Sequence, residues 1–592
     1  MPSTLSYAAR FHRWRLRRIS ERKFVVLLSV LIGIIVGLLA TALKNVVWKL
    51  QDLVNLVVEE SEGNSIYFIL PIVGILLTVL VIRFLVRSPV RPGIPNVLHS
   101  ISQRKGELSK HNLYSSMLTS ALTVSFGGSV GLEGPTVVSG AAYSSVLSRL
   151  FNLDYRNTIL LLACSSAAAM AAIFKAPIAA IVFAVEVIMI DLTTFSLVPL
   201  LLASASAVMT SYFFMGHDVL YPFDVKVTFV VKDLPYYIAL GILCGVVSAY
   251  FTKINIFITN RFDQIGSIQT RLIYGGLLLG LLVFLFPSLY GEGYSAINAC
   301  LSGNYSYLFN NSIFFTLKDH YIVMVMLLIA ISLMKVVATS LALGSGGVGG
   351  IFAPTLFTGV NVGAVFAVIV DRFGSQHLDK NNFALIGMAG LIAGVLHAPL
   401  TGIFLIADIS GGYLLFVPLM ITATFSFITV KAFAPKSVYH SQLAKRRELM
   451  THDKDKNILQ MMDVAKLVET DFVTLHPNAT LRDLTEAISI AHRNLFPVVD
   501  ENGFLKGMVK MDDIRHLIFK QELYDTIKVK ELMYLPEHFI STSDLMERVV
   551  EKFEATGRYN IAVIDEGKYV GFISRAKVFS SYRKKMSHFS YE

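Results

Sequence analysis

The chain has 592 residues, of which 54% are hydrophobic and only 16% charged, and its formal net charge is +10. Because a soluble domain carries about 25% charged residues, this composition excludes a wholly soluble protein and indicates that lipid is one of its solvents. The cysteines, Cys164, Cys244 and Cys300, lie far apart, which argues against a disulfide framework or a zinc site.

Basic residues flank the apolar region on both sides. They are Arg10, Arg13, Arg15, Arg17, Arg18, Arg22 and Lys23 before the first apolar run, and Lys436, Lys445, Arg446 and Arg447 after the last. Lysine and arginine stay on the cytoplasmic side of a membrane, so both termini are predicted to be cytoplasmic. A basic arm can also bind nucleic acid, but this one lacks interleaved aromatic residues and abuts a predicted span.

Long apolar stretches fill residues 24–433. The clearest cover residues 24–47, 66–86, 195–214, 236–257, 272–285 and 321–341. A helix needs about 20 apolar residues to cross the hydrocarbon, so these stretches predict transmembrane helices. The first is longer than a signal-peptide core and has no cleavage site, so we expect it to remain as an anchor, with the cell (inner) membrane as the expected location.

Other apolar runs are shorter and interrupted by glycine or proline. They cover residues 139–150, 177–190, 383–395 and 399–409. Short segments leave backbone groups unpaired in lipid, so they must pack within protein or line a wet cavity. Discontinuous helices of this kind are typical of a channel or transporter.

The membrane region contains an internal repeat of two blocks in the same order. The matched pairs are residues 127–135 with 346–354, and residues 175–181 with 397–403. In both copies of the second pair, an acid lies nine residues after the proline. The acid is Glu186 in the first copy and Asp408 in the second. The repeat predicts two inverted halves, at about residues 24–215 and 233–440, with a site between them.

Three turns rich in glycine and proline, at residues 91–95, 131–135 and 349–354, precede predicted helices. A helix N-terminus is electrically positive and exposes N–H groups, and glycine allows close approach of the backbone. Turns of this kind that converge can replace the water shell of an anion. The sequence therefore predicts a buried anion site.

Beyond about Lys436 the chain becomes charged, and no run is long enough to span a membrane. Residues 456–520 and 528–585 each predict strand–helix–strand–turn–strand–helix, the first beginning with a strand at 472–474. This pattern resembles a tandem pair of CBS domains. In that family a hydroxyl residue and an aspartate three residues apart hold the ribose of a nucleotide. The matching positions here are Lys510 with Asp513, and Ser574 with Lys577, so each motif keeps only one half. Adenine nucleotide binding and a purely structural dimerisation role both stay open.

The three membrane turns are similar, in order, to the Gly-Ser-Gly-Ile-Pro, Gly-Arg/Lys-Glu-Gly-Pro and Gly-x-Phe-x-Pro motifs of the CLC family of chloride channels and anion/proton exchangers. Tyr439 matches a late tyrosine of the same family. The resemblance covers nearly the whole chain and implies a homodimer with one pore per subunit. It implies an all-α membrane domain at 24–440 after a cytosolic arm at 1–23, then a linker at 441–455 and an α/β CBS pair at 456–585.

The resemblance also assigns roles to residues. Glu133 matches the gating glutamate, whose carboxylate blocks the anion path when ionised and swings away when protonated. Ile351 and Phe352 are expected to donate backbone N–H groups to the central ion, and Tyr439 its hydroxyl. The full set implied around the anion is Pro92, Gly93, Ile94, Gly134, Ile351, Phe352 and Tyr439.

Two departures from the family pattern leave the transport mode and the substrate open. Pro92 replaces a serine and offers neither a hydroxyl nor an N–H group; in the family, proline here accompanies a preference for nitrate over chloride. Val187 occupies the position of the inner glutamate that passes protons in exchangers, which favours a passive chloride channel dependent on voltage or pH. Glu186 points about 100° away on the same helix. Exchangers that use water in place of this glutamate keep chloride (or nitrate)/proton antiport as the alternative.

Other functional classes fit less well. The sequence has no His-Glu-x-x-His zinc motif and no phosphate loop, so it predicts neither an enzyme nor a nucleotide-driven pump, and no required cofactor. A cation transporter with CBS domains would need clustered carboxylates, whereas the acids of the membrane region are isolated. Examples are Glu133, Glu186, Asp191 and Asp408. A passive sensor with an inert anchor would not need the paired turns.

Overall fold

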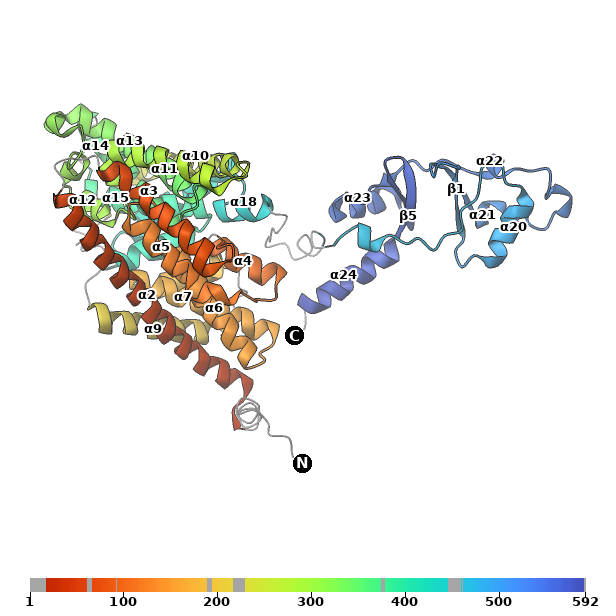
Figure 1. Cartoon of the computed structure of the whole chain (residues 1–592), viewed down its shortest axis with the longest axis horizontal. Helices are drawn as coiled ribbons and strands as arrows, with labels where there is room; N and C mark the ends of the chain where they lie inside the picture. Colours follow the sequence, from red (N-terminus) through yellow and green to blue (C-terminus); the bar gives the residue numbers. More distant parts are fainter. Residues whose placement is uncertain are drawn as a thin grey trace. The chain divides into compact units, whose positions relative to one another are not determined.

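The computed structural model describes residues 18–60, 66–91, 93–188, 194–216, 229–373, 378–445, 459 and 462–589. The chain forms two compact units, Met1–Glu448 and Leu449–Glu592 (Figure 1). Pro92, Asp191, the predicted arm as far as residue 17 and the linker residues 446–455 lie outside the described residues.

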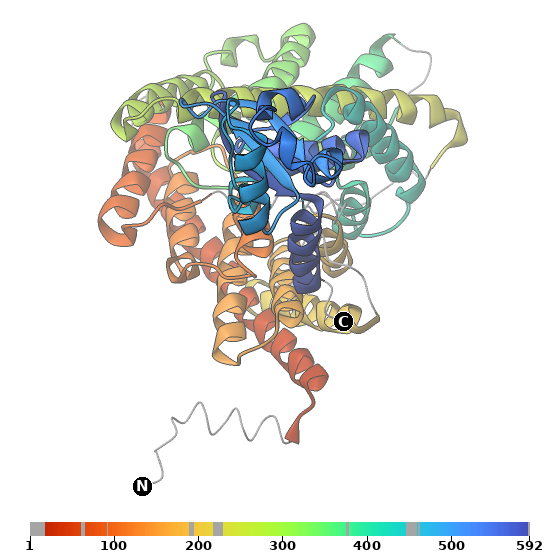
Figure 2. The same cartoon turned by 90° about the vertical axis from the view of Figure 1, so that its right-hand side faces the viewer.

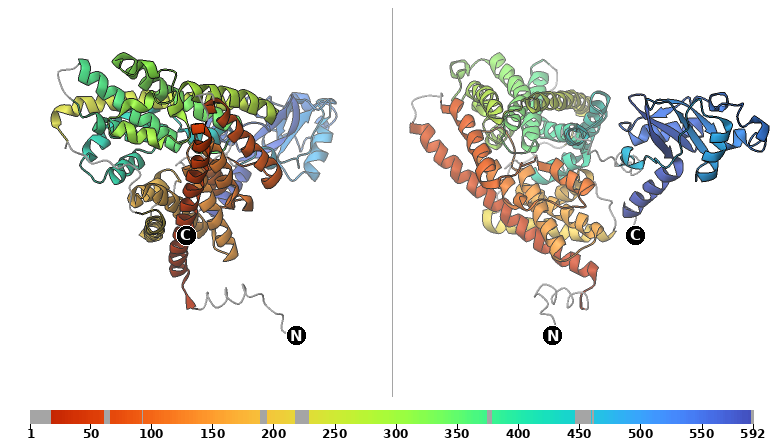
Figure 3. Two further views of the ribbon diagram at one scale, coloured as in Figure 1. Left: turned by 60° about the vertical axis from the view of Figure 1, so that its left-hand side comes forward. Right: turned by 45° about the vertical axis from the view of Figure 1, so that its right-hand side comes forward.

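The first unit is helical. Its first half contains α2 (Glu21–Glu60), α3 (Ile66–Leu80), the π-helix η1 (Val81–Val86), α4 (Gly93–Gln103), the short turn η2 (Lys110–Leu113), α5 (Ser115–Ser125), α6 (Glu133–Leu150), α7 (Tyr155–Phe174), α8 (Pro177–Glu186) and α9 (Thr194–Met215). The long helix α2, in red, packs along α7 and α9 (Figures 1 and 3).

The second half repeats this style of long and short helices. It contains η3 (Val231–Asp233), α10 (Leu234–Asp263), α11 (Ile268–Leu285), η4 (Pro287–Leu289), α12 (Tyr294–Leu301), η5 (Tyr305–Leu308), η6 (Phe315–Leu317), α13 (Tyr321–Gly344), α14 (Phe352–Phe373), α15 (Lys380–Leu396), α16 (Pro399–Ile409), α17 (Phe416–Phe433) and α18 (Val438–Lys445). Within the described ranges, nine helices are long and apolar enough to cross a membrane, whereas α8, α15 and α16 are shorter apolar helices. The last helix, α18, continues past the predicted domain end at 440.

The two repeated blocks fold alike. Gly127 and Gly346, at matched positions, have φ angles of 92° and 109°. Lys175 and His397, which follow α7 and α15, both have a φ of 56°. A left-handed backbone is costly for residues other than glycine, so its recurrence at matched positions shows that both blocks need the same chain reversal.

The acids that recur in the repeat tie the two halves together. Glu186, at the end of α8, accepts hydrogen bonds from the N–H groups of Leu400 at 3.1 Å and Thr401 at 2.7 Å, in the first turn of α16. Asp408, near the end of α16, accepts one from the N–H of Ala179 in α8 at 3.2 Å. A negative charge stabilises a helix N-terminus, so each short helix caps the other. This reciprocal contact explains why both halves carry an acid at this spacing.

Helices α14 and α15 meet through glycine. A methyl group added to Gly387 would lie 2.4 Å from the carbonyl oxygen of Gly359 and 2.9 Å from the Cα of Gly363. Small residues let membrane helices approach this closely and gain van der Waals contact.

The substitution Gly387→Ala is therefore expected to destabilise the helical unit by about 1–3 kcal/mol, because backbone atoms would have to separate. The midpoint of thermal unfolding in detergent checks this. Gly266→Ala is the matched control, since nothing lies within 4 Å of its added methyl group. Equal midpoints for the two variants would show that α14 and α15 are not closely packed here.

The second unit is α/β. Its elements are η7 (Ala465–Leu467), α20 (Leu481–Ile490), β1 (Leu495–Val499), β2 (Leu505–Lys510), α21 (Met511–Ile514), η8 (Gln521–Leu523), α22 (Val529–Leu532), β3 (Phe539–Ile540), α23 (Met546–Thr556), β4 (Asn560–Asp565), β5 (Lys568–Ser574) and α24 (Arg575–Phe589). Strands β1 and β2 pair antiparallel; β4 pairs parallel with β3 and antiparallel with β5. Helix α24, in dark blue, extends straight from the end of β5 (Figure 2).

The two repeats of this unit share a junction, where Phe472 and Met508 pack with Ala562 and Phe572. The predicted strand at 472–474 is wrong. Glu469 pairs with Phe572 of β5, and the chain then crosses to the other repeat, where Leu475 makes a single bridge to β1. Residues 472–474 therefore connect two sheets and do not pair within either.

Candidate functional site

The three glycine-rich turns of the helical unit converge. The N–H of Gly131 donates to the carbonyl of Gly350 at 2.8 Å, and the N–H of Gly350 donates back at 2.7 Å. A methyl group added to Gly93 would lie 2.9 Å from the Cα of Gly134, and one added to Gly134 would lie 3.3 Å from the Cα of Gly350. The positive N-termini of α4, α6 and α14 therefore meet at one place, where an anion would be stabilised.

Apart from Pro92, which lies outside the described residues, the residues that the sequence suggests for anion binding are buried around this point. Ile94 lies in the first turn of α4, and Ile351 and Phe352 open α14. Tyr439 lies on α18, which packs against α4. The Tyr439 hydroxyl has no hydrogen-bond partner in the described part of the chain. Because an unpaired buried hydroxyl is costly, this group is well placed to donate to a ligand.

Glu133, the first residue of α6, lies at the centre of this junction and is fully buried. Its Oε1 accepts a hydrogen bond from the hydroxyl of Tyr294 at 2.5 Å. Its Oε2 lies 2.1 Å from the position that a methyl group on Gly131 would take. The backbone N–H of Ala353 faces the carboxylate, and Tyr439 is close enough to interact with it electrostatically. The carboxylate therefore occupies a position among helix N-termini where an anion would lie.

Two residues that surround Glu133, Glu292 and Tyr294, were missed from the sequence. Glu292 Oε1 accepts a hydrogen bond from the N–H of Leu132 at 3.1 Å, and Tyr294 begins α12. The signal was present, since Gly291-Glu292-Gly293-Tyr294 is a further glycine-rich turn that contains an acid and opens a short helix.

Two buried lysines complete the charged surroundings. Lys335 lies within α13, is fully buried, and donates to the carbonyls of Leu289 at 3.3 Å and Gly291 at 3.0 Å. Lys44 is buried on α2, and both lysines interact electrostatically with Glu292. A lysine inside a predicted span is rare and could have been singled out on that ground.

The predicted proton positions lie elsewhere. Val187 is buried just after α8. Both carboxylate oxygens of Glu186 accept hydrogen bonds from the first turn of α16. The structure therefore gives Glu186 a capping role.

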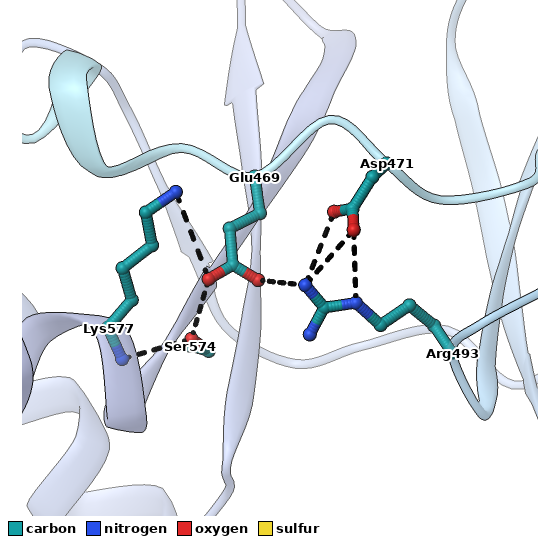
Figure 4. A network of polar contacts seen from close by, with 5 residues as sticks. All are labelled: Glu469, Asp471, Arg493, Ser574 and Lys577. Atoms are coloured by element: carbon teal, nitrogen blue, oxygen red, sulfur yellow. Dashed lines mark hydrogen bonds and ion pairs between the residues drawn. The ribbon is translucent and has the colours of Figure 1, made fainter.

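In the α/β unit, a polar network surrounds the buried Glu469 (Figure 4). Its Oε1 accepts a hydrogen bond from the hydroxyl of Ser574 at 3.0 Å and lies 3.9 Å from Lys577 Nζ. Its Oε2 pairs with Arg493 at 3.1 Å, and Arg493 also pairs with Asp471 at 3.1 Å. The hydrogen bonds from Arg493 hold the pKa of Asp471 below its ordinary value.

This network bears on nucleotide binding. A ribose would need the Ser574 hydroxyl and a carboxylate three residues later, but that hydroxyl donates to Glu469 and Lys577 supplies a cation. The second motif therefore does not fit a ribose. In the first motif, Asp513 is exposed, and Lys510 Nζ lies 4.9 Å from the centroid of the Tyr534 ring.

We expect Arg493→Met to destabilise the α/β unit by about 1–2 kcal/mol, because the Glu469 carboxylate loses a charged partner at a partly exposed site. Thermal unfolding of the full chain in detergent measures this. Arg482→Met is the matched control: Arg482 makes a similar two-pronged pair with Asp525, but both are exposed. If the control lowers the midpoint as much as Arg493→Met, the buried partner contributes nothing.

Comparison with known proteins agrees with this architecture. Residues 73–431 match the family model described as voltage gated chloride channel, and residues 464–520 and 529–584 each match the CBS domain. A relative from Ralstonia nicotianae, named as a ClcB-like chloride channel protein, is 28% identical over 394 residues. The match covers 64% of this chain and 86% of the relative.

Two solved structures share the fold. A slow cyanobacterial Cl⁻/H⁺ antiporter superimposes with a TM-score of 0.62 and 22% identity, covering 72% of this chain and 98% of its own. A eukaryotic CLC transporter superimposes with a TM-score of 0.61 and 19% identity, covering 94% of this chain and 99% of its own.

The family model spans more than half of the chain, and the apolar helices and the α/β repeats match the regions that the two models cover. The chain is an integral, multi-pass membrane protein that belongs to the CLC family of voltage-gated chloride channels and anion transporters, with a C-terminal CBS domain pair.

Proposed function

We propose that the protein conducts chloride through a pore that Glu133 gates, as a passive channel. One observation carries the proposal: the Glu133 carboxylate lies buried where the N-termini of α6 and α14 meet. An ionised carboxylate there competes with an anion for the same positive helix ends, and a protonated one does not. The hydroxyl of Tyr439 and the N–H groups that open α14 are proposed to hold the anion.

The residues at the predicted proton positions, Val187 and Glu186, support the passive mode. Val187 cannot carry a proton, and Glu186 is engaged in capping α16. Proton-coupled antiport is the second candidate, because the buried Glu133 carboxylate has a second acid, Glu292, beside it on the adjoining turn. A cation transporter has no support in the contacts of this site.

Liposomes with an imposed chloride gradient test both modes when anion and proton fluxes are recorded together. Chloride flux that stops at the Nernst potential without proton movement supports the channel. Uphill proton movement that Glu133→Gln abolishes would establish the antiporter. Absence of chloride flux in the wild type would overturn the proposal as a whole.

Nitrate preference is proposed for Pro92 on sequence grounds alone, because proline removes one hydroxyl and one N–H from the first turn. Nitrate holds its water more weakly than chloride and needs fewer donors. Pro92→Ser is expected to increase chloride flux relative to nitrate flux in the same liposomes.

We also propose a homodimer in the cell membrane with cytoplasmic termini. Ile178 and Leu400, in the first turns of the mutually capping helices α8 and α16, are 44% and 53% exposed, and apolar exposure of this kind suits a helix-packing surface.

For the CBS pair we propose adenine nucleotide binding at the Asp513 motif only. Calorimetric titration with ATP, against Asp513→Ala, checks it.

A further inference from the structure

The segment that opens α12 contacts the gate at two adjacent residues. Tyr294 donates its hydroxyl hydrogen to the Glu133 carboxylate, and Glu292 accepts the N–H of Leu132. These contacts join residues 161 and 160 positions apart, one side from each inverted half.

The two contacts have different effects. A hydrogen bond donated to a carboxylate stabilises its ionised form. Tyr294 therefore favours the blocking state, in which the ionised Glu133 side chain lies among the helix N-termini. Glu292 instead anchors the backbone of the turn. Leu132 occupies a position where the family motif has a basic residue, so the gate has no cation beside it in the sequence. The charged and titratable groups that face Glu133 are Tyr294, Glu292, Lys44 and Tyr439.

The segment is itself held in place. Lys335 donates to the carbonyls of Leu289 and Gly291. A methyl group added to Gly293, which has a φ of 88°, would lie 2.7 Å from the Phe357 ring. Because the segment is fixed, Tyr294 cannot follow a carboxylate that swings outward, and opening the gate breaks their hydrogen bond.

We propose that Tyr294 is a latch residue, which positions the Glu133 gate and sets the pH at which it opens. The proposal rests on the proposed function, in which Glu133 gates anion flux. The latch acts on the blocking state alone, so it changes the pH dependence of flux and leaves the flux of the fully open pore unchanged.

Chloride flux from liposomes, measured as a function of pH, tests the latch. In Tyr294→Phe the ionised carboxylate loses a donor, so Glu133 is protonated at higher pH and the profile moves to higher pH by about one unit, a tenfold change in proton concentration. Tyr290→Phe is the matched control, since it removes a hydroxyl from the same segment that is bonded to Ser125. Its profile is expected to coincide with that of the wild type.

A third arm places Tyr294→Phe in a Glu133→Gln background, where the latch predicts no further change in the profile. If Glu133→Gln itself stays pH-dependent, the proposed function fails and the latch with it. If Glu133→Gln loses its pH dependence but Tyr294→Phe has the wild-type profile, only the latch is overturned. An equal shift in Tyr290→Phe would also overturn it, because the effect would then belong to the segment as a whole.

Discussion

Chloride flux through Glu133→Gln is expected to become independent of pH and to exceed wild-type flux about tenfold at one pH unit above the midpoint of the wild-type profile. Glutamine has nearly the same shape as a protonated glutamate and cannot ionise. The gate therefore stays in the form that leaves the path free. The tenfold figure follows because each pH unit above the midpoint of the wild-type profile lowers the protonated fraction of the gate about tenfold. Flux from liposomes between pH 4.5 and 8.5 measures it.

Glu186→Gln is the comparison variant for this experiment. It changes a half-buried acid of the same half, whose oxygens cap α16, and an amide oxygen keeps part of that capping. The pH dependence is expected to survive. If instead Glu133→Gln keeps its pH dependence and Glu186→Gln loses it, the gate has been assigned to the wrong carboxyl group.

The largest effect on stability is expected from Lys335→Met. Lys335 is fully buried and interacts electrostatically with Glu292. It donates to the carbonyls of Leu289 and Gly291, in the segment that opens α12. Removing a buried, hydrogen-bonded charge costs about 3–5 kcal/mol, because two carbonyls lose their donor and Glu292 loses the positive charge that it interacts with. The midpoint of thermal unfolding in detergent is expected to fall accordingly.

Two further variants separate charge pairing from packing. Lys232→Met removes an exposed lysine and is expected to leave the midpoint unchanged. In the double variant Lys335→Met with Glu292→Gln, the stranded carboxylate is neutral, so part of the loss is recovered. A double variant as unstable as the sum of both single variants would show that the lysine and Glu292 are not energetically coupled.

Much of the membrane domain follows from local chemistry that is readable in the sequence. Spans are set by apolar length, and glycine and proline mark where helices begin and reverse, because these residues fix the backbone itself. For this reason the two repeated blocks can be recognised in the sequence, and the matched φ angles of Lys175 and His397 agree with them. The three candidate anion-site turns were predicted by the same route, because backbone donors at helix N-termini need a particular turn and no distant partner, whereas the roles of individual residues came from the family resemblance.

Contacts between distant residues were decided only by the tertiary structure. Tyr294 lies 161 residues from Glu133, and Glu292 lies 160 residues from Leu132, so spacing along the sequence gave no indication of these contacts. The mutual capping of α8 and α16, and the engagement of Ser574 by Glu469, arise in the same way. A side-chain hydrogen bond needs its two partners within about 3 Å, and only the folded chain brings them there. The sequence thus predicted the turns where we propose that an anion binds, and the tertiary structure decided which side chains surround Glu133.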